Sequence, residues 1–284
     1  MTEIAIDGVS KRFRIGRDSM TALEAISLRL EAGGFYALIG PSGCGKSTLL
    51  RLIADVLAPS EGSITIGGQP PDRARRNHAI GFVFQDATLL PWRTVLENVR
   101  LPLEIVGGAI PGGPRPEALI ELVGLAGFEH ARPAQLSGGM QQRVSIARAL
   151  ALKPRVLLLD EPFGALDEIT RQRMNLELLR IWQETGTTAV LVTHTIGEAV
   201  FMADRVHVLA AHPGRLVATV DIDLPRPRTL GLMRGEHFHH LQNRVRDALF
   251  GEEPTPEPRS AGIVAAPGPE GAGPVPERTA AHAG

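Results

Sequence analysis

One octapeptide constrains what this chain can fold into more than any other stretch. Residues 40–47 read Gly-Pro-Ser-Gly-Cys-Gly-Lys-Ser and satisfy the pattern G-x-x-x-x-G-K-[ST]. An apolar run at residues 35–39 precedes it and predicts a buried strand, and residues 46–57 follow with leucine and isoleucine at helical spacing. A glycine-rich turn between a strand and a helix directs backbone N–H groups and the positive helix end toward an anion. The chain is therefore predicted to bind nucleotide phosphates.

Each residue type in this loop suits a phosphate ligand. Lys46 is predicted to reach the β- and γ-phosphates as a point charge, and the Ser47 hydroxyl to ligate Mg²⁺. Cys44 reads as a small, tolerated side chain rather than a redox catalyst, or as a thiol whose modification blocks the nucleotide. The full set predicted to surround the phosphates is Gly40, Pro41, Ser42, Gly43, Cys44, Gly45, Lys46, Ser47 and Thr48.

The rest of the folded part alternates strand-like and helix-like patterns. Buried strands are predicted at residues 80–84, 155–159 and 189–193, and two further strands at 204–209 and 216–222. One helix is predicted to begin at the capping box of residues 94–97. A second is predicted to end at residue 150, and a third, at residues 234–250, is predicted to close the domain. Apolar strands separated by helices indicate an α/β fold with a mostly parallel sheet.

Two further segments carry polar residues next to predicted elements. Asp160 and Glu161 end a strand of four aliphatic residues, where an aspartate can hold Mg²⁺ and a glutamate can polarise water. The alternative is a surface turn of two solvated acids. Ser137 and the glycines that follow it at a helix start predict either a second anion site or a plain N-cap.

Charge and composition exclude several classes of protein. The chain has 284 residues with 30 basic and 31 acidic side chains, which leaves a net charge of −1 and no overall attraction to nucleic acid. One cysteine excludes an internal disulfide framework and suits a reducing compartment. The start lacks a signal-peptide pattern, and no apolar run reaches the roughly 18 residues of a membrane span. We expect an intracellular protein that does not itself cross a membrane.

Composition changes near residue 250. Residues 251–284 hold seven Pro, six Gly and seven Ala, with few large apolar side chains. Such a segment buries too little surface to offset the entropy cost of ordering it. We expect one domain at residues 1–250 and a disordered tail at 251–284. A partner-binding arm is the alternative, for which the tail carries no motif.

Six motifs in order give the chain a specific resemblance over residues 1–250: it resembles the ATP-binding subunits of ABC transporters. Residues 40–47 match the Walker A motif and residues 158–161 the Walker B motif of that family. Residues 136–142 match its signature, with Met140 where glutamine is commonest. The remaining matches are Gln85 to the Q-loop, Asp167 to the D-loop and His194 to the switch histidine.

This resemblance implies a fold and a composite site. The implied fold is a P-loop ABC ATPase with an N-terminal antiparallel β subdomain and an α-helical signature subdomain at about residues 87–153. Two such subunits pair head to tail with two ATP molecules at the interface. Each ATP is implied to contact Lys46, Ser47 and Gln85 of one chain and Ser137, Gly138 and Gly139 of the other. Mg²⁺ is implied at Ser47, Gln85 and Asp160.

The resemblance also implies roles for single residues. Glu161 polarises the attacking water, His194 contacts the γ-phosphate, and Asp167 links the two sites across the interface. Phe13 matches the aromatic residue that stacks on adenine, although its alternative is a strand core residue. Thr195 stands where the family usually has Asp, and residues 195–198 read as a capping box that keeps the N-cap of the next helix.

The stretch Leu-Leu-Pro-Trp at residues 89–92 looks like the importer group for nitrate, sulfonate and taurine. Leu89, Leu90 and Trp92 are expected either to pack in the core or to border the groove that receives the membrane subunit. The resemblance implies an ATPase at the cytoplasmic face of the membrane that forms a homodimer, binds a permease, depends indirectly on a solute-binding protein, and does not bind nucleic acid. The alternatives are a thiamine-pyrimidine precursor as solute, a soluble ATPase acting on nucleic acid or ribosomes, and a non-hydrolysing nucleotide sensor.

Overall fold

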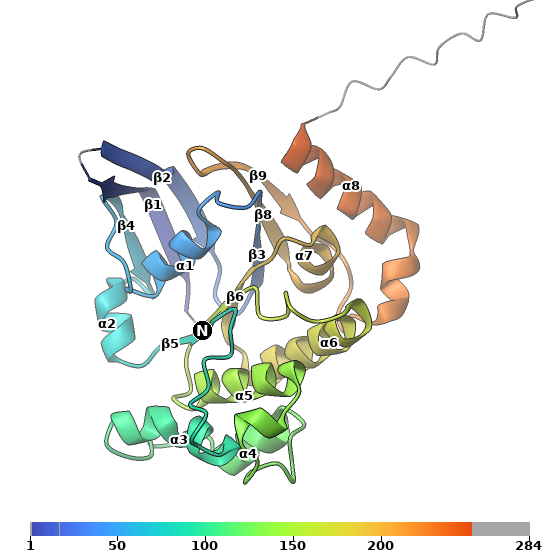
Figure 1. The fold of residues 1–284 in the computed structure, drawn as a ribbon. Helices are drawn as coiled ribbons and strands as arrows, with labels where there is room; N and C mark the ends of the chain where they lie inside the picture. Colours follow the sequence, from blue (N-terminus) through green and yellow to red (C-terminus); the bar gives the residue numbers. More distant parts are fainter. Residues whose placement is uncertain (1, 17, 252–284) are drawn as a thin grey trace, which may run out of the picture. The chain divides into compact units, whose positions relative to one another are not determined.

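The computed structural model describes residues 2–16 and 18–251 (Figure 1). Within these ranges the chain forms a six-stranded sheet, a three-stranded sheet and eight α-helices. None of the helices there has both the length and the apolar character needed to cross a membrane. The predicted disordered tail lies outside the described residues, except for Gly251.

The larger sheet has the strand order β5-β6-β7-β3-β8-β9. Neighbouring strands from β5 to β8 are parallel, and β9 runs antiparallel to β8. The strands are β3 (Phe35–Ile39), β5 (Ile80–Val83), β6 (Val156–Asp160), β7 (Thr188–Val192), β8 (Arg205–Ala210) and β9 (Arg215–Asp221). The prediction of an α/β fold with a mostly parallel core sheet is confirmed.

The smaller sheet is antiparallel and has the order β2-β1-β4. Its strands are β1 (Ile4–Ile15), β2 (Asp18–Leu30) and β4 (Glu61–Ile66). This sheet is the antiparallel subdomain that the resemblance implied.

The helices divide between the flanks of the large sheet and a separate helical group. They are α1 (Lys46–Ile53), α2 (Pro71–Arg76), α3 (Val95–Ile105), α4 (Pro116–Leu122), α5 (Gly138–Leu150), α6 (Glu168–Thr185), α7 (Ile196–Met202) and α8 (Glu236–Phe250), with 3₁₀ turns η1 (Pro133–Gln135) and η2 (Leu230–Arg234). Helices α3, α4 and α5 pack on one another and lie together at the bottom of Figure 1. They form the expected helical subdomain, with the signature at the start of α5.

Strand β3 explains why the predicted core strands read as continuous apolar runs. Its side chains alternate between the two faces of the sheet. Phe35, Ala37 and Ile39 belong to one hydrophobic core, and Tyr36 and Leu38 belong to the core on the other face. Both faces are covered, so every residue of the strand is buried and none needs to be polar.

Two local predictions were wrong in detail. The helix predicted for residues 46–57 ends at Ile53, because Asp55 takes a left-handed conformation (φ 58°) that the helix cannot continue through. The capping box predicted at residues 195–198 does not form, since the Thr195 side chain accepts no cap hydrogen bond. Glu198 is instead buried and accepts a hydrogen bond from Thr193. The capping box at Thr94 is confirmed.

A histidine in the large sheet gives the fold a predicted pH dependence. His207 is 2% exposed, and its Nδ1 lies 2.9 Å from the hydroxyl of Thr219 on the neighbouring strand. Its ring stacks on Tyr36 with 6.0 Å between centroids. Burial lowers the pKa of His207 to about 4. The folded chain therefore keeps this ring neutral at pH values where an unfolded chain protonates it.

We expect the domain to lose stability as pH falls from about 6.5 to about 4, because only the unfolded His207 takes up a proton in that range. The loss from this residue is at most about 3 kcal/mol of unfolding free energy. Urea unfolding at neutral and at mildly acidic pH should show a smaller loss for His207→Phe than for the unaltered chain. Equal pH dependence of the two proteins would assign the loss to other groups.

Candidate nucleotide-binding site

Four neighbouring parallel strands end at one edge of the larger sheet, and each leads into predicted site residues. The segment carrying Gln85 follows β5, Asp160 and Glu161 lie at the end of β6, His194 follows β7, and residues 40–47, the phosphate loop, follow β3. Since the strands are parallel, their carboxyl ends lie at the same edge. The sheet thus brings together residues that are more than 100 positions apart in the sequence.

The lysine of the phosphate loop is buried against its own loop. Lys46 is 6% exposed, and its Nζ donates hydrogen bonds to the carbonyl oxygens of Gly40 (2.7 Å) and Pro41 (3.0 Å). A buried ammonium is costly unless hydrogen-bond acceptors surround it. These carbonyls therefore hold the positive charge inside the curve of the loop.

The shape of the loop depends on backbone contacts that leave no room for a side chain. A Cβ on Gly40 would lie 2.4 Å from the carbonyl oxygen of Leu209, the second-last residue of β8. A Cβ on Gly214, in the β8–β9 turn, would lie 2.1 Å from the carbonyl oxygen of Cys44. Cys44 itself is fully buried in the core, which supports its interpretation as a small packing side chain rather than an accessible thiol.

Ser47 and Asp160 meet at the start of α1. The Ser47 hydroxyl donates a 2.7 Å hydrogen bond to Asp160 Oδ1. Asp160 is 6% exposed, and burial raises the pKa of its carboxyl group. A hydroxyl and a carboxylate side by side are oxygen donors of the kind that Mg²⁺ takes alongside phosphate oxygens. The donor set at this position therefore fits the ion that the sequence predicted.

Glu161 and His194 face each other beside this pair. Glu161 Oε2 lies 3.4 Å from His194 Nδ1, and the two side chains are 23% and 54% exposed. Glu161 also has φ 46°, a left-handed conformation that costs a non-glycine residue about 1–2 kcal/mol. Its backbone N–H donates to the carbonyl of Val192 at the end of β7. This contact helps to hold the strained residue in place between the two strand ends.

The phosphate loop opens into a pocket of about 300 Å³. Phe13 and Glu161 line this pocket together with Ser42, Gly43, Gly45, Lys46, Ser47 and Thr48. The Phe13 ring is half-buried and lies 5.1 Å from the Lys11 ammonium, so it is not the strand core residue that the alternative proposed. The pocket therefore combines the flat face of the Phe13 ring with the phosphate loop, which carries the Lys46 charge and several backbone N–H groups.

The signature segment lies elsewhere in the same chain. Ser137 accepts a hydrogen bond from the Met140 N–H and is the N-cap of α5, as predicted. The Cα of Gly139 faces α6, where an added Cβ would touch Thr170 at 3.7 Å. Asp167 is the N-cap of α6 through a 3.0 Å bond from the Thr170 N–H. None of these residues lines the phosphate-loop pocket.

Comparison with known proteins decides the family. A family model described as "ABC transporter" matches residues 23–164, which is half of the chain. This chain belongs to the ABC transporter family. It is 42% identical over 242 residues to the aliphatic sulfonates import ATP-binding protein SsuB of Bacillus cereus, across 85% of this chain and 94% of that protein. It is 41% identical over 262 residues to the nitrate transport protein NasD of Klebsiella oxytoca, across 88% and 97% of the two chains.

A solved structure supports the same assignment. It is a dimeric ATP-binding cassette in a post-hydrolysis state, bound to ADP and Pi. The TM-score is 0.68 at 35% sequence identity, across 78% of this chain and all of that one.

Sequence reasoning missed how this ABC transporter chain holds the segment after β5. Gln142 of α5 donates to the carbonyl of Gln85 through its amide nitrogen. Arg148, also on α5, donates to the carbonyls of Ala87 and Thr88 at 2.8 and 2.9 Å. These bonds join residues 57 to 61 positions apart, so no local pattern could predict them. The Gln85 side chain is exposed and does not line the phosphate-loop pocket.

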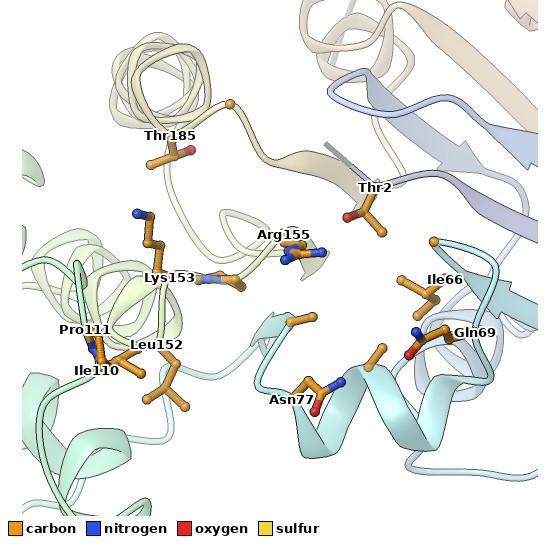
Figure 2. A pocket seen from close by; sticks show the side chains of 15 residues that line it. Thr2, Ile66, Gln69, Asn77, Ile110, Pro111, Leu152, Lys153, Arg155 and Thr185 are labelled. Carbon is orange, nitrogen blue, oxygen red and sulfur yellow. The ribbon is translucent and has the colours of Figure 1, made fainter.

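A larger hollow of about 720 Å³ lies near the opposite end of the parallel strands (Figure 2). Lys153 and Arg155, which precede β6, line it with Gln69, Asn77 and Thr185. It contains none of the predicted site residues. Ligands of open parallel sheets bind beyond the carboxyl ends of the strands, so position favours the smaller pocket at the phosphate loop.

We expect Lys46→Ala to lose tight ATP binding, because the substitution removes a buried charge next to the phosphate site. Lys153→Ala is the matched control, since it removes an ammonium from the larger hollow instead. Titration with a fluorescent ATP analogue measures both affinities. If Lys153→Ala lost ATP binding while Lys46→Ala bound ATP normally, the nucleotide site would be assigned to the larger hollow instead.

Proposed function

We propose that this chain is the ATP-hydrolysing subunit that powers the import of a small solute through a separate membrane permease. The observation that carries this proposal is the convergence of the phosphate loop, Ser47 with Asp160, and Glu161 with His194 at one sheet edge. The similarity to import and transport proteins for sulfonates and nitrate supports the importer assignment.

The phosphate-loop pocket is proposed to hold ATP. Its loop amides and Lys46 bind the phosphates, and Phe13 stacks on the adenine ring. The residues assigned to contact ATP within one chain are Phe13, Gly40, Pro41, Ser42, Gly43, Cys44, Gly45, Lys46, Ser47, Thr48 and Gln85. Bound Mg²⁺ neutralises charge on the β- and γ-phosphates. Ser47 and Asp160 are placed to hold it, with Gln85 as a further ligand.

Glu161 is the proposed base for hydrolysis. Its carboxylate orients a water molecule whose oxygen attacks the γ-phosphorus, and it takes up the proton that this water loses. The bond between the γ-phosphorus and the bridging oxygen to the β-phosphate breaks. His194, whose Nδ1 lies 3.4 Å from Glu161 Oε2, is proposed to donate a hydrogen bond to the γ-phosphate. Lys46 remains paired with phosphate oxygens throughout.

Two copies of the chain are proposed to complete each site. Ser137 and Gly138 are exposed and lie outside the phosphate-loop pocket of their own chain, so the start of α5, which also holds the buried Gly139, is proposed to contact the ATP of a partner copy. Asp167 at the start of α6 is then the residue that connects the two sites. The dimeric state of the similar cassette with ADP and Pi supports this arrangement.

We expect Glu161→Gln to lower ATP hydrolysis by roughly 10²-fold or more, because the amide keeps the shape of the side chain but cannot accept the proton. ATP binding should persist, so the head-to-tail dimer should accumulate. Gel filtration with ATP and Mg²⁺ measures the dimer, and phosphate release measures the rate. Glu236→Gln on the exposed start of α8 is the control. A normal rate in Glu161→Gln would show that another group is the base.

The contribution of the partner copy can be separated in the same assay. Adding Ser137→Arg to Glu161→Gln should abolish the ATP-dependent dimer, because the bulky cation would occupy the interface. ATP binding by the monomer should remain. Loss of binding by the monomer would show that Ser137 acts within its own chain.

The permease is proposed to bind at the segment after β5. Leu89 packs against the core, whereas Trp92 is 67% exposed, so Trp92 is the residue proposed to border the permease groove. Phe84 is also exposed beside this segment. Exposed large apolar side chains of this kind are candidates for an interaction surface. This contact would place the chain at the cytoplasmic face of the membrane.

We expect a tagged chain to bring down an integral-membrane permease, and Trp92→Ala to lose it while the free chain binds ATP normally. Phe250→Ala, which truncates an aromatic side chain of similar exposure, is the control. The solute is proposed to be nitrate, a sulfonate, taurine or a thiamine-pyrimidine precursor. Growth of a deletion strain on each compound identifies it. Co-purification of nucleic acid or ribosomes instead of a permease would overturn the importer assignment.

A further inference from the structure

The helix that follows the switch histidine contains a buried acid outside the roles proposed so far. Glu198 lies in the first turn of α7 and is 8% exposed. One of its carboxyl oxygens, Oε2, accepts a hydrogen bond from the Thr193 hydroxyl. The other, Oε1, is buried without a partner among the described residues. A carboxyl group is expensive to bury, so its place here calls for a physical reason.

Thr193 connects Glu198 to the backbone around His194. The Thr193 hydroxyl donates to Glu198 and accepts a 3.1 Å hydrogen bond from the Thr195 N–H. The Thr193 N–H in turn donates to the carbonyl of Leu38 in β3. His194 therefore lies between two residues whose positions are both tied to the Glu198 carboxyl group. The ring of His194 projects from this fixed frame toward Glu161.

Burial dominates the surroundings of the Glu198 carboxyl group. Burial raises the pKa of its carboxyl group, more than Thr193, Arg171 and Asn175 lower it. Arg171 of α6 is paired with Glu168, so it is not a dedicated partner for Glu198. Asn175 Oδ1 is likewise a buried acceptor without a donor in the described chain.

The far end of α7 is fixed independently. The buried guanidinium of Arg228 donates to the carbonyls of Val200 and Phe201 in the last turn of the helix. Helix α7 is thus held at its end by Arg228 and at its start by Glu198. Both attachments restrain the helix that follows His194.

We propose that Glu198 is a positioning residue for His194, acting through the hydroxyl of Thr193. The proposal rests on the assignment of His194 to the γ-phosphate. Glu198 does not line the phosphate-loop pocket. It fixes the backbone on both sides of the histidine, so that the ring keeps its distance from Glu161 and its direction toward the site.

Three substitutions test this link. Thr193→Val removes the bridging hydroxyl at nearly constant volume, and Glu198→Leu removes its acceptor. Both should lower kcat for ATP by roughly tenfold or more while KM changes little, because misplacing a catalytic group costs rate rather than binding. Glu198→Gln keeps an oxygen that accepts from Thr193 and should restore a nearly normal rate. Glu184→Gln, at an exposed position of α6, is the control.

A double-substitution cycle separates positioning from general damage. In a His194→Ala background, Thr193→Val should cost no further activity, since the residue it positions is gone. A full additional loss would show that Thr193 and Glu198 support the fold rather than His194. Thermal unfolding of each variant provides the stability comparison. If Glu198→Leu does not fold, Thr193→Val alone decides the outcome.

A second readout does not depend on hydrolysis. In chain labelled at histidine side chains, the ring signal assigned to His194 by its loss in His194→Ala should shift in Thr193→Val and stay in place in Glu198→Gln. An unchanged signal in Thr193→Val would overturn the inference even if the chain hydrolyses ATP. A shifted signal in a chain without ATPase activity would instead overturn the proposed function and leave the positioning role intact.

Discussion

The parallel pairing of β5, β6, β7 and β3 is the constraint on which the rest of this structure depends. It places four carboxyl ends side by side, and each end supplies a different chemical group: a glutamine segment, two acids, a histidine and the phosphate loop. Parallel pairing requires long crossover connections, so these groups must come from distant parts of the chain. The strands must also be largely apolar on both faces, which explains the apolar runs that lead into the motifs at these four strand ends.

Local patterns predicted most of the elements because their causes are local. The capping box at Thr94 and the alternation of strand β3 depend on residues a few positions apart. The same reasoning failed at Thr195, where the sequence satisfies a capping box but Glu198 bonds inward to Thr193. The buried hydroxyl of Thr193, directly after β7, competes for that carboxyl group. The packing of the folded chain determines whether the Glu198 carboxyl group bonds to the backbone of Thr195 or to the hydroxyl of Thr193.

The candidate site likewise combines features that the sequence could predict with features that depend on the folded packing. The types of residue in the phosphate loop and at the end of β6 follow from phosphate and metal chemistry, so the sequence could predict them. Lys46 bonding to its own loop carbonyls and Gln142 holding the Gln85 carbonyl could not be predicted, because these contacts depend on the curvature of a loop or on the packing of a distant helix. The separation of Ser137 from the phosphate-loop pocket also emerges only when the chain is folded.

The backbone contacts around the phosphate loop bear on whether such a loop can be transplanted. Gly40 lies against the end of β8, and Gly214 of the β8–β9 turn lies against the carbonyl of Cys44. This turn is itself hydrogen-bonded to the backbone of β2. The Glu24 N–H donates to the carbonyl of Gly214, and the Gly214 N–H donates to the carbonyl of Ala22. The eight residues therefore owe their curvature to two strands and a turn outside the motif. Grafted onto another scaffold without these neighbours, the same octapeptide would be a flexible, glycine-rich linker rather than a preformed cradle.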